Sequence, residues 1–233
     1  MVKRRALLMA KMDPPLKNEK EWNDYYNKIH VADRVEIPGF LSARRFKKVE
    51  GIPRQYSIPG DSQYLSLYDL VNVNVLNGKD YRKVWEKDHA KPQYSFEYQI
   101  FKLPKFARGI FEQIFPENDE YTAPDSRYVL LVGHEIPRGK ASEFNAWYNT
   151  EHIPMLLKVP GVLNIRRFVM SRGETPPIVG GGIVSKYLTI WDVEDPKAFE
   201  TEEFQKPAAS PWSQWVRSWY TRKICCLYQR IYP

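Results

Sequence analysis

The sequence predicts an α+β protein in which one β-α-β-β-α-β unit occurs twice in tandem. Residues 21–46 align with residues 143–168 without a gap, at a shift of 122 positions (143 − 21). Downstream of each copy lies a matched strand pattern, QYLSLYDL at 63–70 and KYLTIWDV at 186–193. Such self-similarity indicates an internal duplication. Eleven of the 26 aligned pairs are identical: Glu21/Glu143, Asn23/Asn145, Tyr26/Tyr148, Asn27/Asn149, His30/His152, Pro38/Pro160, Gly39/Gly161, Leu41/Leu163, Arg44/Arg166, Arg45/Arg167 and Phe46/Phe168.

The first unit begins with a predicted strand at 5–12, which the Asp13-Pro14-Pro15 turn ends. A helix is expected at 19–37, because apolar side chains recur there every three or four residues until Pro38-Gly39. Strands are expected at 40–49, 63–71 and 94–103, with a second helix at 77–89. Residues 106–115 are predicted as a short helix, and 116–126 are polar.

The second unit repeats this order. Strands are expected at 127–136, 162–170, 186–193 and 222–231, and a helix at 142–159 that Ser142 caps. Further helical pieces are predicted to start at 195–203 and to cover 212–220. Gly180-Gly181-Gly182 lacks the helix and the Lys-Ser/Thr of a phosphate-binding loop, so a flexible lid or a plain turn is expected in the loop at 172–184.

Three segments follow from this order: a first ferredoxin-like unit at 1–104, a linker at 105–126 and a second unit at 127–233. Each unit has one sheet with helices on one side, so its other face needs a cover. The strands are apolar on both faces, as in VLLV at 129–132. The two sheets are therefore predicted to pack face to face.

Composition narrows the classes of function. The net charge of +7 is moderate for 233 residues, and no nucleic-acid-binding signature is present. No apolar run approaches the ~20 residues of a membrane span, and the adjacent Cys225 and Cys226 do not indicate a disulfide framework. The four histidines lack the close spacing of a metal-binding pair. We expect a cytoplasmic protein without a metal or other cofactor, either a monomer with two equivalent halves or a homodimer.

The run WYNTEHIPMLLKVPGVLNIRRF at 147–168 resembles the dimeric α+β barrel superfamily and, within it, the EthD-like proteins. The matching pieces are the Trp147-Tyr148 pair, the Glu-His-Ile-Pro turn at 151–154, Pro160-Gly161, the Arg-Arg-Phe run at 166–168 and Tyr187-Leu188. The first copy departs from the pattern at Ile29 and Ala32. The resemblance implies an intramolecular dimeric α+β barrel with a ligand pocket in each unit, between the sheet and its helices. Reactions in this superfamily include cofactor-free monooxygenation, haem degradation, polyketide cyclisation, isomerisation and dehydration.

A helical turn in each copy carries the candidate site. Because an α-helix turns by about 100° per residue, His152 is expected beside Tyr148, with Asn145 and Asn149 on the same flank of the helix. His30 repeats this arrangement with Asn23 and Asn27. An imidazole is a usable acid or base near neutral pH, and amides hold a carbonyl or an enolate oxygen. In the alternative interpretation, His152 only satisfies backbone groups that Pro154 leaves free.

Three more residues complete the candidate list. His134 ends a strand in phase with Tyr128, so it can meet His152 across the pocket, unless it is only a packed strand residue. Trp147, with Tyr148, belongs to an aromatic-rich lining that suits aromatic or polyketide-like ligands. Arg166 either anchors a carboxylate or phenolate, or forms a salt bridge to Glu143 or Asp192.

These features predict a cofactor-free acid/base enzyme of the lyase or isomerase type. It would act on a hydrophobic, oxygenated small molecule as a cyclase, dehydratase, isomerase or C–C lyase. His152, His134 and His30 are the candidate catalytic residues; Tyr148, Asn149, Asn145, Trp147 and Arg166 are the candidate substrate-binding residues. The alternatives are a monooxygenase, cofactor-free or haem-dependent, and a non-catalytic ligand-binding or stress protein. The second unit is expected to hold the main site, because it keeps Glu151, Pro154 and His134.

Overall fold

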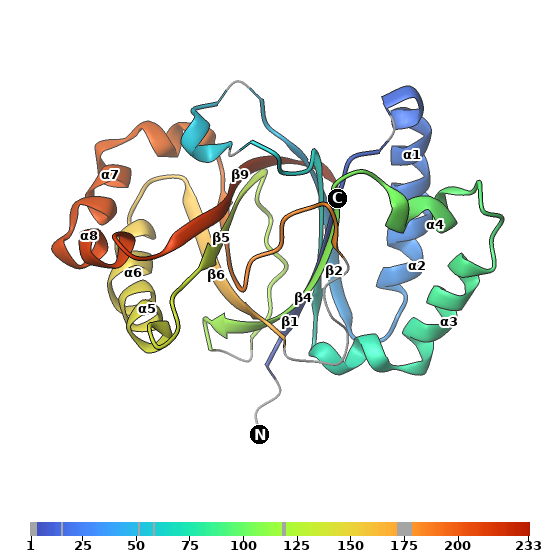
Figure 1. Ribbon diagram of the computed structural model, residues 1–233, viewed down its shortest axis with the longest axis horizontal. Coiled ribbons are helices and arrows are strands. Elements are labelled where there is room, and N and C mark those ends of the chain that lie inside the picture. Colours follow the sequence, from blue (N-terminus) through green and yellow to red (C-terminus); the bar gives the residue numbers. More distant parts are fainter. Residues whose placement is uncertain (1–3, 15, 51, 58, 118–119, 172–178) are drawn as a thin grey trace.

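The computed structural model describes residues 4–14, 16–50, 52–57, 59–117, 120–171 and 179–233. Within these ranges, eight strands form one closed antiparallel barrel in the order β1-β3-β2-β9-β5-β8-β6-β4, and β4 returns to β1 (Figure 1). A two-residue strand, β7 (Val179–Gly180), pairs with β4 outside the barrel order. The barrel strands are β1 (Ala6–Met12), β2 (Phe40–Lys48), β3 (Tyr64–Leu70), β4 (Phe106–Phe115), β5 (Tyr128–Glu135), β6 (Val162–Met170), β8 (Tyr187–Val193) and β9 (Thr221–Tyr232).

Each half of the chain supplies four neighbouring strands in the same relative order. The first half gives β4-β1-β3-β2 and the second gives β9-β5-β8-β6. The predicted face-to-face packing of the two sheets takes the form of a closed barrel, because the sheets also join edge to edge. Phe46 pairs with Arg230 across β2 and β9, and Gln113 pairs with Phe168 across β4 and β6. This joining pairs the backbone groups that two open sheets would leave exposed at their edges.

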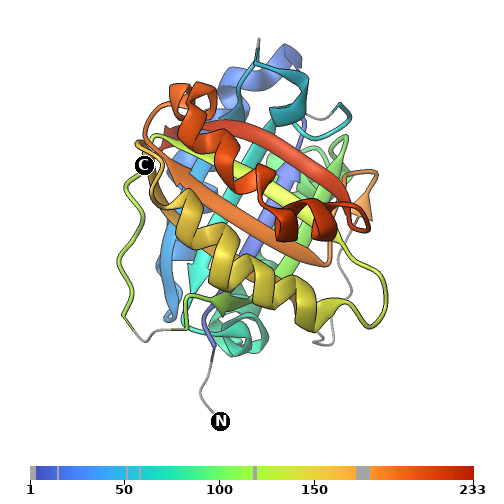
Figure 2. The same ribbon diagram turned by 90° about the vertical axis from the view of Figure 1, so that its left-hand side faces the viewer.

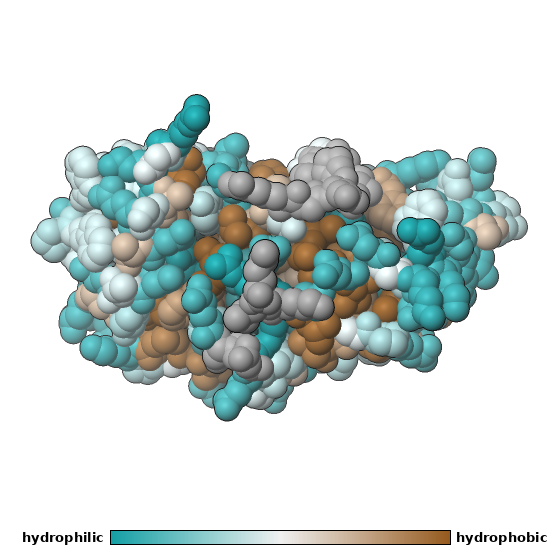
Figure 3. All heavy atoms as spheres, turned by 90° about the horizontal axis from the view of Figure 1, so that it is seen from below, coloured by the Kyte–Doolittle hydropathy of each residue, from teal (hydrophilic) through white to brown (hydrophobic). Residues whose placement is uncertain are grey.

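Helices cover the outside of the barrel at opposite ends of the molecule (Figures 1 and 2). The first half carries α1 (Glu19–Tyr25), α2 (Val31–Val35), α3 (Lys79–His89) and α4 (Phe96–Gln99). The second half carries α5 (Ala141–Trp147), α6 (Ile153–Leu156), α7 (Glu202–Ala209) and α8 (Pro211–Arg217). The described residues therefore form an apolar core inside the barrel and one further core under each set of helices. Seen from below, apolar residues gather near the middle and polar residues dominate the helical ends (Figure 3).

The two repeated helices are interrupted at the same place. A π-helical turn at Tyr26–His30 separates α1 from α2, and another at Tyr148–His152 separates α5 from α6. Such turns insert an extra residue into the helical repeat and are frequent at functional sites. Gly39 and Gly161 follow the two helices with φ of 101° and 86°, a conformation that glycine adopts without strain. The helix-ending role predicted for Pro38-Gly39 is therefore confirmed, and Pro160-Gly161 occupies the same place in the second half.

Two segments of the first half differ from the prediction. The residues predicted as a short helix form strand β4, in which buried and partly exposed residues alternate from Ala107 to Ile114. The residues predicted as the fourth strand form α4 and a 3₁₀ turn at Ile100–Lys102. Ser95 begins this helix, because its Oγ accepts a hydrogen bond from the Tyr98 amide at 3.3 Å.

The second half follows its predicted order more closely. The helical piece expected near 195–203 is a 3₁₀ turn at Pro196–Glu200 followed by α7, which continues through Pro207. The loop expected at 172–184 lies partly outside the described residues, and Gly180 belongs to β7. No helix within the described ranges is long and apolar enough to cross a membrane.

The inner face of the barrel carries four buried charges that connect the halves. Arg44 Nη1 donates to Asp192 Oδ1 at 3.0 Å, and Arg166 Nη1 donates to Asp69 Oδ1 at 2.7 Å. Each pair joins one half to the other, and all four side chains are at most 7% exposed. The salt-bridge interpretation of Arg166 is thus the one observed, with Asp69 as its close partner and Asp192 at 3.9 Å.

Candidate active site

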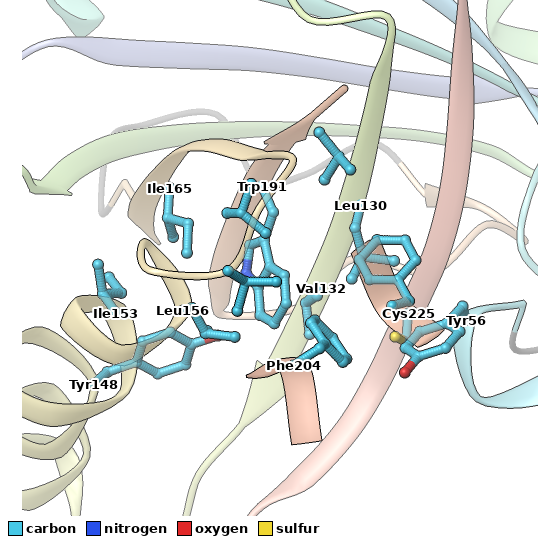
Figure 4. Close-up of a cluster of buried hydrophobic side chains, with 14 of the residues drawn as sticks. Tyr56, Leu130, Val132, Tyr148, Ile153, Leu156, Ile165, Trp191, Phe204 and Cys225 are labelled. Carbon is cyan, nitrogen blue, oxygen red and sulfur yellow. The ribbon is translucent and has the colours of Figure 1, made fainter. Parts of the chain in front are cut away.

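A cavity of about 180 Å³ lies in the second half, between the barrel and its covering helices. Figure 4 shows Trp191 between Tyr148 and Leu156 on one side and Leu130 and Val132 on the other. This is the location that the sequence resemblance implied. The lining residues are Gln55, Tyr56, Leu130, Val132, His134, Trp147, Tyr148, His152, Leu156, Trp191, Phe204, Gln205, Ala208, Arg217, Tyr220 and Arg222.

The π-helical turn positions His152. Because the turn brings residues five apart next to each other, the imidazole stacks on Trp147 with ring centroids 4.5 Å apart. Burial, aided by Arg217 and Arg167, lowers the pKa of His152 to about 3, and a backbone hydrogen bond with Pro207 partly opposes this. A proline backbone can only accept, so the ring donates to it, and the Nδ1 atom has no partner.

His134 faces the same cavity from strand β5. It is 2% exposed and lies edge-on to Tyr148 and Tyr220, with centroids 5.8 and 4.9 Å away. Burial lowers its pKa well below the usual value, and Arg167, Arg222 and His152 add to the effect. Both cavity histidines are therefore neutral at ordinary pH.

Aromatic side chains from both halves form most of the remaining wall. Burial raises the pKa of Tyr148 to about 12, so its phenol stays protonated. Tyr56 belongs to the first half, yet it stacks on Phe199 at 4.8 Å and lies 6.0 Å from Phe204. The second-half site is thus completed by a loop of the first half, although the sequence predicted a pocket formed within each unit.

Three nitrogens on side chains that line this cavity lack a hydrogen-bond partner. His134 Nδ1, His152 Nδ1 and Trp191 Nε1 are buried and have no hydrogen-bond partner. Leaving such a group unsatisfied costs about 1–3 kcal/mol. Three of them on side chains that line one cavity indicate a site that accommodates polar atoms of a ligand or of ordered water.

Asn145 and Asn149 do not line the cavity. Their carboxamide oxygens accept from Arg167, at 2.8 Å to Nη2 and 2.6 Å to Nη1. The guanidinium also lies 4.4 Å from the centre of the Tyr148 ring. Asn23 and Asn27 hold Arg45 in the same way. The repeated asparagines therefore fix an arginine between helix and sheet, and the π turn directs His152 away from them.

In the matching region of the first half, the histidine is packed against neighbouring side chains. His30 is 7% exposed; its Nδ1 lies 3.4 Å from the Tyr25 hydroxyl, and its ring lies 4.4 Å from that of Tyr26. A buried ion pair between Arg34 and Asp88 occupies the space beside it. Arg166 lies inside the barrel. The structure therefore brings His134, His152, Trp147 and Tyr148 together, and leaves His30, Asn145, Asn149 and Arg166 outside the cavity.

Several lining residues were not predicted. Arg217, Tyr220 and Arg222 lie where α8 leads into β9, and Gln55 and Tyr56 lie in a loop between β2 and β3. None of them falls in the repeated segment, so the comparison of the two copies gave no signal. Within the described part of the chain, no group of three His, Cys, Asp or Glu residues could hold a metal ion.

The buried histidines make folding stability depend on pH. His30, His134 and His152 have folded-state pKa values below the usual ~6.5, so the unfolded chain binds more protons between the two values. Stability is fully present above pH ~6.5 and falls as the pH drops, by about 1.4 kcal/mol per pH unit for each histidine. Urea unfolding between pH 6.5 and 5 should show this slope, and His152→Gln should remove one histidine's share. An unchanged slope in the variant would mean that His152 is solvated in the folded protein.

Comparisons with known proteins bear on the fold. No protein-family model matches the chain, and no curated protein is significantly similar in sequence. Among solved structures, an anthrone oxidase-like protein is 14% identical with a TM-score of 0.60, over 99% of this chain and 92% of that chain. A protein from Fusobacterium nucleatum described as a monooxygenase is 8% identical with a TM-score of 0.57, over 99% of this chain and 94% of that chain. One from Lactobacillus acidophilus is 11% identical with a TM-score of 0.56, over 97% and 93%.

The fold is that of the dimeric α+β barrels. A chlorite dismutase from Candidatus Nitrospira defluvii, 10% identical with a TM-score of 0.50, also matches, over 99% of this chain and 92% of that chain. At these identities the likeness concerns the backbone alone. The reaction has to be argued from the cavity itself.

Proposed function

We propose that the protein is a small-molecule enzyme whose first step removes a proton from a hydrophobic, oxygenated aromatic substrate in the second-half cavity. The observation that carries this proposal is the pair of neutral, buried histidines whose Nδ1 atoms have no partner. A neutral imidazole with a free lone pair is the form that accepts a proton. The apolar, aromatic lining supplies the binding surface for a planar ring system.

His152 is the proposed base, and Trp191 supports the charge that develops. When a proton leaves a carbon beside a carbonyl, the negative charge moves to the carbonyl oxygen. The buried Trp191 Nε1–H interacts with the Tyr148 hydroxyl but is not in hydrogen-bonding geometry with it, so it can donate to such an oxygen. Tyr148 keeps its proton and is a second candidate donor. The resulting anion can return the proton at another atom, lose a leaving group or break a C–C bond, which covers the isomerase, dehydratase, cyclase and lyase reactions.

A second candidate is oxidation of the same anion by dioxygen. The structures similar to this chain include an anthrone oxidase-like protein and proteins titled as monooxygenases, which favours this outcome. With anthrone the balance is simple: one O₂ converts the CH₂ group to a carbonyl and leaves one water, giving anthraquinone. Proton removal precedes this reaction as well, so both candidates assign the same role to His152.

Haem chemistry is not part of the proposal. The cavity of about 180 Å³ is below the range of about 300–1,000 Å³ typical of sites for larger ligands, so a haem macrocycle does not fit. The residues and the size of the cavity therefore do not fit the predicted haem-dependent alternative.

Anthrone is a suitable probe, because it is a planar C–H acid with one carbonyl. In deuterated buffer without oxygen, the protein should exchange the CH₂ protons of anthrone faster than buffer does, as measured by mass spectrometry. In air, an oxygen electrode distinguishes the two candidates, because only the oxidase consumes O₂ in step with anthraquinone formation. If anthrone bound in the cavity but exchanged at the buffer rate, the enzyme proposal would be wrong and a ligand-binding role would take its place.

The origin of the site belongs to the same proposal. Matched residues and matched strand order support a tandem duplication of a ferredoxin-like unit related to the EthD-like proteins. After duplication, one copy is free to lose its site. The filled first half, with His30 packed against Tyr26 and Arg34 paired to Asp88, supports a single working site in the second half.

A further inference from the structure

Two arginines at the mouth of the cavity have no acidic partner. Arg217 ends α8 and Arg222 lies near the start of β9, and both line the cavity. Arg217 is exposed and Arg222 is half-buried, and neither forms an ion pair with an Asp or Glu anywhere in the described ranges. None of the described lining residues is acidic. The cavity therefore carries two positive charges without a counter-charge from the protein.

The two guanidinium groups are directed to the same region. Both lower the pKa of Tyr220 and of Tyr56 against the effect of burial, and Arg217 also forms a side-chain hydrogen bond with Tyr220. Tyr220 lies edge-on to His134, and Tyr56 stacks over Phe199 at the opposite wall. Both positive charges thus lie near the two tyrosines, with which they share the lining of the cavity.

Apart from the two histidine Nδ1 atoms assigned to proton transfer, the groups of the lining that lack a partner favour an anion. Trp191 Nε1–H and the two guanidinium groups can only donate hydrogen bonds. Among the described lining residues, no buried side-chain oxygen lacks a hydrogen-bond partner. A ligand rich in acceptor oxygens fits these donors, and planar guanidinium groups bind carboxylates in a bidentate manner.

We infer that the substrate is an aromatic anion whose carboxylate or phenolate oxygen binds Arg217 and Arg222 while its ring system lies between His152, His134 and Trp191. This inference rests on the proposed function and names the substrate class of the same site. It moves the predicted anion anchor from Arg166, which is committed to Asp69, to two residues outside the repeat.

Anion binding also has a consequence for the base. Arg217 lowers the pKa of His152 and Arg222 lowers that of His134. A negative charge placed on these arginines offsets their effect on the imidazoles, so the histidines become stronger bases once the substrate is bound. The substrate's own charge would then help to activate the residue that deprotonates it.

Calorimetric titration with 2-naphthoate and 2-naphthamide tests the inference, because the two probes have the same ring system and differ in charge. We expect naphthoate to bind at least ~10-fold more tightly at low ionic strength, and the difference to shrink as salt is added. Arg217→Gln and Arg222→Gln should each reduce the preference, and the double variant should abolish it. Arg82→Gln, a change at a distant helix of the first half, should leave it intact.

Several results would overturn the inference. Equal binding of the two probes to the wild type would show that the arginines do not distinguish a charged from a neutral ligand. An unchanged preference for naphthoate in a folded double variant would show the same. If the double variant unfolds, Arg217→Lys with Arg222→Lys keeps the charges; it should retain the preference, and its loss would contradict the inference. Anthrone exchange is measured separately, so exchange without naphthoate preference would reject the anionic substrate alone and leave the proposed function standing.

Discussion

Replacing His152 with glutamine is expected to slow proton removal from the substrate by about 10²–10⁴-fold. Glutamine keeps a polar group beside Trp147, but it has no lone pair basic enough to take the proton. Binding of 2-naphthoate should change little, because the proposed anion contacts come from Arg217 and Arg222. The measurement is the rate of deuterium exchange into anthrone without oxygen, together with the titration of naphthoate.

The matched control is His30→Gln, which makes the same change at the equivalent position of the first half. His30 is buried beside Tyr25 and Tyr26 in a filled region. The variant should keep its exchange rate within about twofold and lose stability, because it disturbs a packed core. Equal losses of activity in the two variants, with both proteins still folded, would contradict a single site in the second half.

Replacing Asp192 with asparagine is expected to lower the free energy of unfolding by about 3–5 kcal/mol. Asp192 accepts hydrogen bonds from Arg44 at 3.0 Å and from Ser126 at 2.7 Å, inside the barrel. Without the carboxylate charge, the remaining acidic partner of Arg44 among the described residues is Asp69, at 3.9 Å, and Asp69 is already bound by Arg166. A buried guanidinium without close compensation is strongly unfavourable.

Asp125→Asn is the control for this change, because the Asp125 carboxylate pairs with Arg230 at 2.9 Å but is 97% exposed. An exposed pair contributes about 0–1 kcal/mol, so that variant should unfold almost like the wild type. Urea unfolding followed by tryptophan fluorescence gives both values. Adding Arg44→Met to Asp192→Leu removes both charges and should recover much of the loss. A cost for Asp192→Asn as small as that for Asp125→Asn would contradict the role of the buried pairs.

The fold could be predicted largely because the repeat fixed which segments are equivalent. Strand β6 has the predicted bounds, and the order of the second half was recovered with small shifts. The region around 94–115 was misassigned because Phe106–Phe115 has aromatic and aliphatic residues at both helical and strand spacings. This segment is a strand because it pairs with β1 and β6. Such long-range pairing is not visible in a local sequence pattern.

The candidate site was recovered in part, for a local physical reason. A 3.6-residue period places His152 next to Tyr148 and on one flank with Asn149, but the π turn at Tyr148–His152 brings it against Trp147. Asn145 and Asn149 then bind Arg167. Arg217, Arg222 and Tyr56 reach the cavity from segments far from the repeat, so only the closed fold shows that they belong to it.

A crystal structure of the protein with 2-naphthoate tests the central claim most directly, because it reports where an aromatic anion binds. We expect the ring system in the second-half cavity beside His152, His134 and Trp191, with the carboxylate within hydrogen-bond distance of Arg217 or Arg222. Naphthoate bound instead in the first half, for example in the open groove lined by Asn23, Lys47 and Tyr64, would contradict the account.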